Sequence, residues 1–153
     1  MRDILVLGIG NRLMADDGIG VFLVEALQQR QQLEPESNIR FVVGESDIDY
    51  CLSEIEGAGL LLLVDAVKSG KTPGELAVYH LEKYGAHDPG ISAHDLHLFQ
   101  MIPHMYPGLQ AEVIGIEAER IEFGLELSEA LQERFGELLQ AIFELIKAYE
   151  RSE

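Results

Sequence analysis

The sequence predicts an α/β fold: a three-layer α/β/α sandwich around a twisted, mostly parallel sheet of about five strands. Short apolar runs alternate along the chain with longer segments in which apolar residues recur every three or four positions. Some of the runs are apolar throughout, which is typical of parallel strands covered on both faces. The 153 residues contain no repeat, low-complexity tract or interdomain linker, so we expect residues 1–153 to form a single domain.

Five segments are expected to be strands. The first, residues 3–9, is short, mostly apolar and followed by a glycine-rich stretch. The third, residues 60–67 (LLLLVDAV), is apolar enough to be covered on both faces. The fourth, residues 76–82, alternates more and is expected nearer an edge of the sheet. The second and fifth strands are expected at residues 39–44 and 111–119.

Four segments are expected to be helices, near residues 19–31, 47–56, 92–105 and 128–151. Asp47 and Ser128 are residue types that cap helix N-termini, and each precedes an amphipathic segment. Pro103 is expected to end or kink the third helix. Residues 83–92 are expected to form a loop.

The composition narrows the classes of partner. The 27 acidic residues outnumber the 11 basic ones and give a formal charge of −16. Such a chain repels nucleic acid and anionic membrane surfaces, whereas a basic partner or a metal ion is easier to accommodate. We see neither a signal peptide nor an apolar run of the roughly 20 residues that span a bilayer. The single cysteine, Cys51, excludes an internal disulfide. We therefore expect a cytoplasmic, monomeric protein without nucleic-acid or membrane partners.

Carboxylates follow three of the expected strands. Asp16 and Asp17 come after the first strand, Glu45 and Asp47 follow the second, and Asp65 ends the third. Ligands of open α/β sheets bind beyond the carboxyl ends of the strands. Asp17 also suits a helix N-cap, and Asp65 suits a polar strand end that turns the following loop. Because the two stand at neighbouring strand tips, a functional site is the favoured interpretation.

A nucleotide site is the first alternative, because residues 8–20 (GIGNRLMADDGIG) begin like a phosphate-binding loop. Gly8 and Gly10 match the first glycines of G-x-G-x-x-G, but Leu13 stands in place of the third. Asp16 and Asp17 would repel a phosphate by roughly 4 kcal/mol at about 4 Å and an effective dielectric constant of about 20. That exceeds the roughly 0.3–1 kcal/mol which a helix N-terminus contributes to anion binding. The sequence therefore disfavours a nucleotide.

A metal site fits these residue types better. Carboxylates together with an imidazole suit borderline divalent ions such as Zn²⁺ or Ni²⁺. His94 and His97 are three residues apart on an expected helix and share a face, but the text HDLH lacks the glutamate of H-E-x-x-H. A lone histidine at a helix start is more often structural. Spacing alone does not choose among the five histidines, which are His80, His87, His94, His97 and His104.

Nucleophilic catalysis has weaker support. Ser46 lies in GESD, which is not the G-x-S-x-G of a nucleophile elbow. Cys51 lies among acidic residues that disfavour a thiolate, and a buried helix position is its simpler interpretation.

With these residues in hand, the chain resembles the nickel–iron hydrogenase maturation endopeptidases. The opening stretch matches the family block G-x-G-N-x-L-x-x-D-[DE]-x-x-G. LLLLVDAVKSGKTPGE resembles the family's apolar strand ending in Asp-Ala and its Pro-Gly turn. SAHDLHL is similar to the segment with the metal-binding histidine, and IGIEAERIEFGLELSEAL to the late strand, loop and C-terminal helix. The resemblance spans nearly the whole chain.

The resemblance implies a protease that removes the C-terminal extension of a hydrogenase large-subunit precursor after nickel insertion. It also implies that Asp17, Asp65 and His94 bind the metal, so that a preformed site reads the nickel carried by the substrate. Asp16, Asp17, Glu45 or a metal-bound carboxylate could serve as general base for water, or the ion could lower the pKa of the water.

The chain departs from the family pattern after the second strand. Members commonly carry Asp-Gly-Gly-Thr there, whereas this chain has VGES, with Val43 at the aspartate position and Glu45 at the second glycine. Glu45 or Asp47 could substitute for the missing aspartate. A non-catalytic metal-binding or nickel-delivery protein on the same scaffold is the alternative from another class.

Overall fold

The computed structural model describes residues 2–35, 38–83 and 90–152. The strands are β1 (Ile4–Ile9), β2 (Ile39–Glu45), β3 (Leu60–Val67), β4 (Leu76–His80) and β5 (Gln110–Glu117). The helices are α1 (Ile19–Leu33), α2 (Ile48–Ile55), α3 (Ala93–Met105) and α4 (Glu129–Arg151), with single 3₁₀ turns η1 (Ala15–Gly18) and η2 (Leu81–Lys83).

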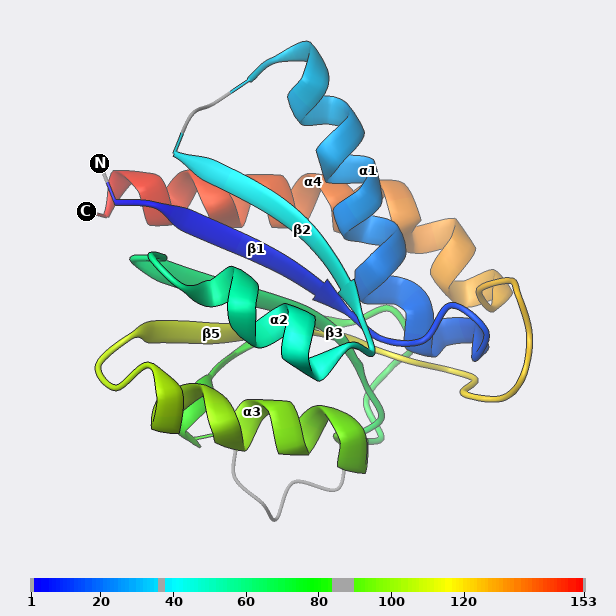
Figure 1. The fold of residues 1–153 in the computed structure, drawn as a ribbon. Coiled ribbons are helices and arrows are strands. Elements are labelled where there is room, and N and C mark those ends of the chain that lie inside the picture. Colours follow the sequence, from blue (N-terminus) through cyan, green and yellow to red (C-terminus); the bar gives the residue numbers. More distant parts are fainter. Residues whose placement is uncertain (1, 36–37, 84–89, 153) are drawn as a thin grey trace.

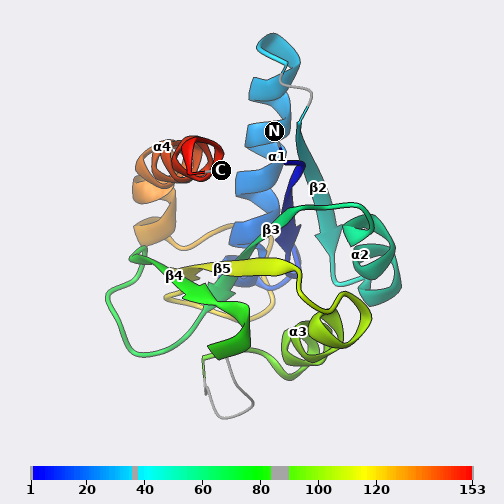
Figure 2. The same cartoon turned by 90° about the vertical axis from the view of Figure 1, so that its left-hand side faces the viewer.

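The five strands form one sheet in the order β2-β1-β3-β5-β4. All neighbouring pairs are parallel except β4 and β5, so the more alternating fourth strand lies at an edge, as its sequence predicts. Helices α1 and α4 cover one face of the sheet, and α2 and α3 cover the other (Figures 1 and 2). The three-layer sandwich is therefore confirmed.

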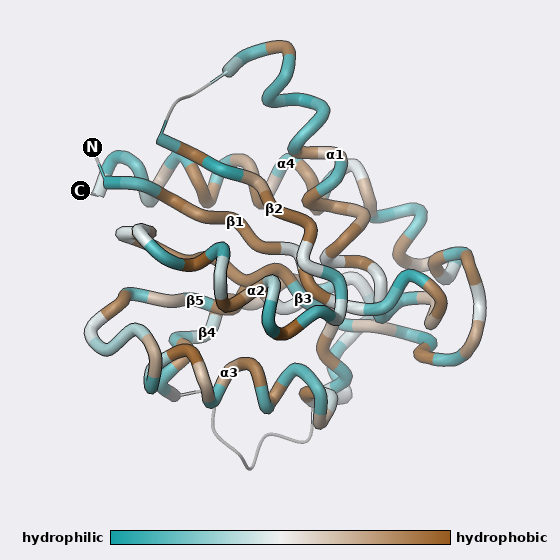
Figure 3. The backbone as a smooth tube through the Cα atoms, in the orientation of Figure 1, coloured by the Kyte–Doolittle hydropathy of each residue, from teal (hydrophilic) through white to brown (hydrophobic). Residues whose placement is uncertain are grey.

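Alternate residues of each central strand enter two separate apolar cores. In β3, Leu62 and Val64 pack towards α1 and α4, whereas Leu61 and Leu63 pack towards α2 and α3. This is why the strand is apolar at consecutive positions. In Figure 3 the central strands are mostly apolar along their length, whereas the helices alternate between apolar and polar residues. Asp65 continues the odd-numbered register of β3 and therefore faces the α2 and α3 layer.

Most expected boundaries agree with the structure to within two or three residues. Pro103 lies in the last turn of α3 and does not end the helix, which continues to Met105. The expected loop at residues 83–92 lies largely outside the described residues, because residues 84–89 are not described. Among the described residues, no helix has both the length and the apolar character needed to cross a membrane.

The sheet changes its direction of winding beside β1. The chain passes from β1 to β2 on one side of β1 and then to β3 on the other. Pairing between β1 and β3 stops at Gly8 and Val64, while β3 continues beside β5 to Val67. Asp65 is therefore the first residue of β3 beyond the end of its pairing with β1. An open α/β sheet forms its ligand crevice at such a switch point.

Candidate functional site

The turn after β1 is packed against its own helix, and this explains its glycines. Gly10 has a φ of +133°, and a Cβ there would lie 2.0 Å from the carbonyl oxygen of Asp17. A Cβ on Gly20 would lie 2.1 Å from the carbonyl oxygen of Val64 in β3. The glycines therefore allow the chain to turn sharply off β1 and let α1 begin directly against the sheet. These close approaches involve the protein's own backbone, in keeping with the sequence argument against a phosphate loop.

Asp17 lies in η1 and faces the crevice. Its Oδ2 accepts a hydrogen bond of 2.9 Å from the backbone N–H of Asn11. The N-cap residue of α1 is Gly18, and no side chain caps that helix, so the N-cap interpretation of Asp17 is wrong. Partial burial raises the pKa of Asp17, and the nearby charge of Asp95 raises it further, while the Asn11 bond and His94 act in the opposite direction.

Asp65 is buried and lies beside a second carboxyl group, that of Asp95 on α3. Burial raises the pKa of Asp65 well above its usual value, and the charge of Asp95, a hydrogen bond with it and the charge of Asp17 add to the effect. The backbone N–H of Ala66 donates to Asp65 Oδ1 at 2.8 Å and acts in the opposite direction. Three acidic side chains from β3, α3 and the β1–α1 turn thus converge at the switch point.

Sequence reasoning missed Asp95, although a signal was present. Ser92 and Asp95 have the S-x-x-D spacing of a capping box, and the Ser92 hydroxyl does accept a hydrogen bond from the Asp95 N–H at 3.1 Å. Asp95 is buried, and such a carboxyl group requires a partner because burying an isolated charge is costly.

His94 stands on the exposed rim of this acidic cluster. Its Nε2 lies 2.6 Å from the carbonyl oxygen of Ser46 in the β2–α2 turn. Because a carbonyl only accepts hydrogen bonds, Nε2 carries the proton in this arrangement, and Nδ1 is the nitrogen left to bind a metal when the ring is neutral. The nearby His94 also favours the ionised form of Asp17.

The expectation of a preformed metal site is not met. Among the residues that the structure describes, no three His, Cys, Asp or Glu side chains are close enough to hold one ion together. The structure brings Asp17 and Asp65 into one electrostatic cluster and places His94 beside it. Assigning Asp17, Asp65 and His94 as joint ligands therefore requires a change in the position of at least one of these side chains.

Asp16 is fully buried and turns away from this cluster. Its carboxylate accepts hydrogen bonds from the N–H groups of Glu119, Arg120 and Ser128, at 2.9, 2.9 and 2.7 Å. The Ser128 hydroxyl donates a fourth at 2.7 Å, so it does not cap α4 as expected, although Ser128 does occupy the N-cap position. These bonds give Asp16 a structural role that joins η1 to the segment before α4.

Glu45 is exposed and forms an ion pair with Arg12, with Nε and Oε1 2.9 Å apart. The same arginine contacts Glu25 at 2.6 Å, and both carboxylates raise its pKa. Glu45 has a φ of +53°, a left-handed backbone that favours glycine, which fits the glycine of the family pattern at this position. Val43 packs against the core beneath α1 and α4, and Asp47 caps α2 through the Tyr50 N–H.

The remaining polar candidates have other partners or surroundings. Cys51 is buried, and burial raises its pKa to about 12, with added effects from Asp47 and Asp95. His80 pairs with the buried Glu112 at 2.6 Å, at the opposite end of the sheet. His97 and His104 lie on exposed parts of α3, and His87 lies outside the described residues.

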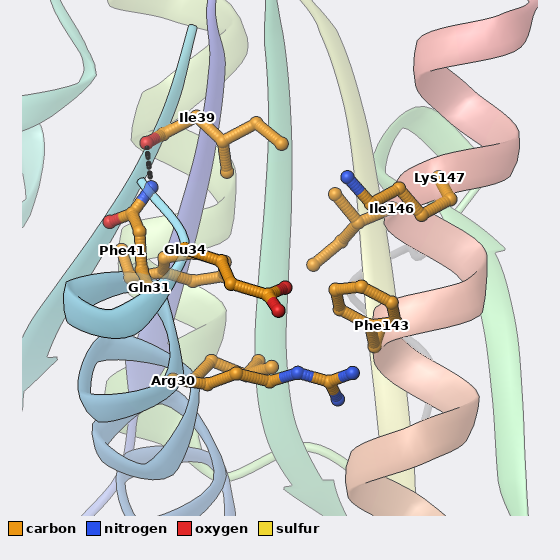
Figure 4. Close-up of a pocket in the computed structure, with 9 residues that line it drawn as sticks. Arg30, Gln31, Glu34, Ile39, Phe41, Phe143, Ile146 and Lys147 are labelled. Carbon is orange, nitrogen blue, oxygen red and sulfur yellow. Dashed lines mark hydrogen bonds between the residues drawn. The ribbon is translucent and has the colours of Figure 1, made fainter. Parts of the chain in front are cut away.

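A cleft elsewhere on the molecule does not include the cluster. It measures about 160 Å³ and lies between α1, the start of β2 and α4 (Figure 4). Arg30 reaches across it and stacks on Phe143, with its guanidinium carbon 3.7 Å from the ring centre. None of Asp17, Asp65 and His94 lines this cleft.

Comparisons with known proteins identify the family. The hydrogenase maturation protease family matches residues 21–145. The hydrogenase expression/formation protein HoxM of Cupriavidus necator is 32% identical over 128 residues, which cover 78% of this chain and 61% of that protein. HoxM of Azotobacter vinelandii is 29% identical over 154 residues, covering 94% of this chain and 72% of that protein. The chain thus spans less than two thirds of the length of the first of these relatives.

The fold has counterparts among solved structures. The hydrogenase maturating endopeptidase HybD from E. coli aligns with a TM-score of 0.79 at 22% identity, covering 96% of this chain and 93% of that one. The fold and the site define a doubly wound α/β domain with an acidic cluster at its switch point. The chain belongs to the hydrogenase maturation protease family.

Proposed function

We propose that this chain is an endopeptidase that removes the C-terminal extension of a nickel–iron hydrogenase large-subunit precursor after nickel insertion. Family membership supports the reaction class. The single observation that carries the assignment to this site is the convergence of Asp17, Asp65 and Asp95 beside His94 at the switch point of the sheet.

The electrostatics of the cluster suit a metal ion that arrives with the substrate. Burial and like charge raise the pKa values of Asp17 and Asp65, so their ionised forms are short of compensating positive charge. Among the described residues, no lysine or arginine forms an ion pair with either of them. A nickel ion held by the precursor would supply that charge, and carboxylate and imidazole groups are suitable ligands for it.

We assign metal recognition to Asp17, Asp65 and His94. In this assignment His94 binds through Nδ1 while Nε2 stays on Ser46, or it leaves Ser46 and turns towards the acids. Docking of nickel then completes the site, so the protease responds to metal loading of the precursor. In the structure these three side chains are not close enough to hold one ion together. This supports a site that forms only when the substrate binds.

Cleavage requires an activated water, and the chain offers several carboxylates. Asp17 is the best placed, because it is only partly buried and lies at the crevice beside Asp95 and His94. Asp16 is occupied by four hydrogen bonds and Glu45 by Arg12, so we leave both out of the proposed catalytic set. No acyl-enzyme is required, which agrees with the raised pKa of Cys51.

The test is incubation of the protein with nickel-loaded and nickel-free precursor, followed by intact mass measurement. We expect loss of a C-terminal peptide only from the nickel-loaded precursor. A protein that binds the loaded precursor without shortening it would be a nickel carrier. Equal cleavage of both precursors would refute recognition through the metal while leaving the protease activity in place.

A further inference from the structure

The segment between β5 and α4 exposes large apolar side chains beside the β1–α1 turn. Phe123 is 79% exposed, Leu125 is 68% exposed, and Ile121 is also exposed. Leu13, on the neighbouring turn, is 51% exposed. We call these four residues, Leu13, Ile121, Phe123 and Leu125, the rim patch. Large exposed apolar side chains gathered on two paired segments are typical of sites where another protein binds.

The two parts of the rim patch are fixed to each other by backbone hydrogen bonds. Gly124 N–H donates to Leu13 at 2.8 Å, and Ala15 N–H donates to Gly124 at 2.8 Å. The Asp16 carboxylate ties both ends of the same segment to η1, through the hydrogen bonds from Glu119, Arg120 and Ser128 described above. The rim patch is therefore a built surface, joined to the turn that carries Asp17. Figure 1 shows the two segments side by side at one end of the molecule.

The apolar surface continues into a shallow cleft between α1 and α4. Leu125 and Leu127 line this cleft together with Phe22 and Ala26 of α1 and Phe135 of α4, and its volume is about 510 Å³. The rim patch and the cleft thus form one surface on the α1 and α4 side, joined through the η1 turn to the segment that carries Asp17. An extended partner segment could occupy it while another part of the partner reaches Asp17.

The charges around the rim patch are mainly negative. Residues 119–129 contain four glutamates, all exposed, which are Glu119, Glu122, Glu126 and Glu129. The one basic residue of this segment, Arg120, is 3.3 Å from Glu122. Lys68 approaches from the β3–β4 turn and donates to the Glu119 carbonyl. An apolar surface bordered by these glutamates complements a partner that presents apolar side chains flanked by lysine or arginine.

From this surface we infer that the rim patch is the docking site for the hydrogenase large-subunit precursor, engaging an apolar segment of it with basic flanks. The inference rests on the proposed function. Docking here would hold the precursor by a surface joined to the η1 turn, which also carries Asp17, so that the nickel centre and the scissile extension can reach Asp17. The rim patch supplies affinity, and the acidic cluster supplies metal recognition and chemistry.

The test compares wild-type protein with the triple variant Leu13→Ser, Phe123→Ser and Leu125→Ser. We expect the KM for nickel-loaded precursor to rise about tenfold or more with little change in kcat, because the three serines remove apolar anchors for the precursor without touching the acidic cluster. Leu33→Ser is the matched control, since Leu33 is 84% exposed at the far end of α1. The variant Glu122→Lys with Glu126→Lys should slow association and weaken its dependence on salt.

Binding of the precursor is measured separately, by titration without cleavage. If wild type cleaves or binds the precursor and the triple variant does so with unchanged KM or affinity, docking at the rim patch is refuted. If wild type binds but never cleaves, the proposed protease function fails while the binding data still decide the docking site. If wild type neither cleaves nor binds, both fail.

A wild-type dimer in sedimentation that the triple variant loses would instead assign the patch to a second copy of this chain and overturn the inference. Should the triple variant unfold, Phe123→Ser alone serves, since that side chain is largely in solvent.

Discussion

Asp16 and Asp17 are adjacent in the chain, but their carboxylates serve opposite sides of the η1 turn. Asp16 accepts four hydrogen bonds from the segment before α4, one of them from the Ser128 hydroxyl at 2.7 Å. Asp17 accepts one from Asn11 and faces Asp95 and His94. One aspartate thus fixes the turn, and the other is held at the crevice. The two should respond differently to substitution.

Replacement of Asp16 by alanine is expected to destabilise the protein by about 3–5 kcal/mol, because three backbone N–H donors and the buried Ser128 hydroxyl lose their charged acceptor. Asp17→Ala should have a much smaller effect, since it removes one hydrogen bond and relieves like-charge repulsion. Urea unfolding of the two variants measures both free energies. Equal losses would contradict the division of roles.

Asp17→Asn and His94→Ala are each expected to reduce processing of nickel-loaded precursor by at least about a hundredfold while the fold remains intact. The matched control is His97→Ala, three residues further along α3 and also exposed, which should process the precursor normally. Intact mass against time measures the rates. Normal processing by His94→Ala, or equal impairment by His97→Ala, would show that the assigned histidine is wrong.

Asp65→Asn is expected to abolish processing of nickel-loaded precursor, as for the other two assigned ligands.

Asp65→Asn should also raise the free energy of unfolding at neutral pH in metal-free buffer, and this gain should disappear in acid. The folded-state pKa of Asp65 lies well above the 3.8 of the unfolded chain, because of burial, Asp95 and Asp17. The native state therefore holds this proton more tightly, and the free energy of unfolding falls as pH rises from 3.8 through the folded-state pKa. Asparagine at this position carries no charge, so the fall in the free energy of unfolding does not occur. Its amide can also donate a hydrogen bond to Asp95. Urea unfolding from pH 4 to pH 8 measures the difference, and a difference independent of pH would contradict the prediction.

Cys51 is expected to resist thiol reagents in the folded protein. It is buried, and its pKa of about 12 leaves almost no thiolate at neutral pH. Colour development with a disulfide reagent should be absent from native protein and reach one equivalent in denaturant. Rapid reaction without denaturant would indicate that α2 opens from the sheet.

Gly20→Ala is expected to destabilise the protein by about 3 kcal/mol or more, because the new Cβ would lie 2.1 Å from the Val64 carbonyl oxygen. Gly136→Ala on the exposed face of α4 is the control, since a Cβ there meets nothing within 4 Å. Alanine is also the better helix former, so the control should be neutral or stabilising. Thermal unfolding of both variants measures the contrast.

The sequence by itself determined the strands, the helices and the layer order, because these depend on local apolar periodicity. The run of residues 60–67 is apolar at consecutive positions because it meets two cores, and this is readable without knowing the partners. The sequence also placed Asp17 and Asp65 at neighbouring strand tips, because parallel strands of one sheet end at the same edge.

Only the tertiary structure decided what each polar side chain contacts. Asp16 meets Ser128 across 112 residues of sequence, so neither the anchoring role of Asp16 nor the redirected hydroxyl of Ser128 can be read from local patterns. Asp95 enters the cluster because α3 packs on the face of β3 that carries Asp65, and this depends on how the layers assemble. Side-chain orientation at a site is set by packing between distant segments, whereas the elements that carry the site are set by their own sequence.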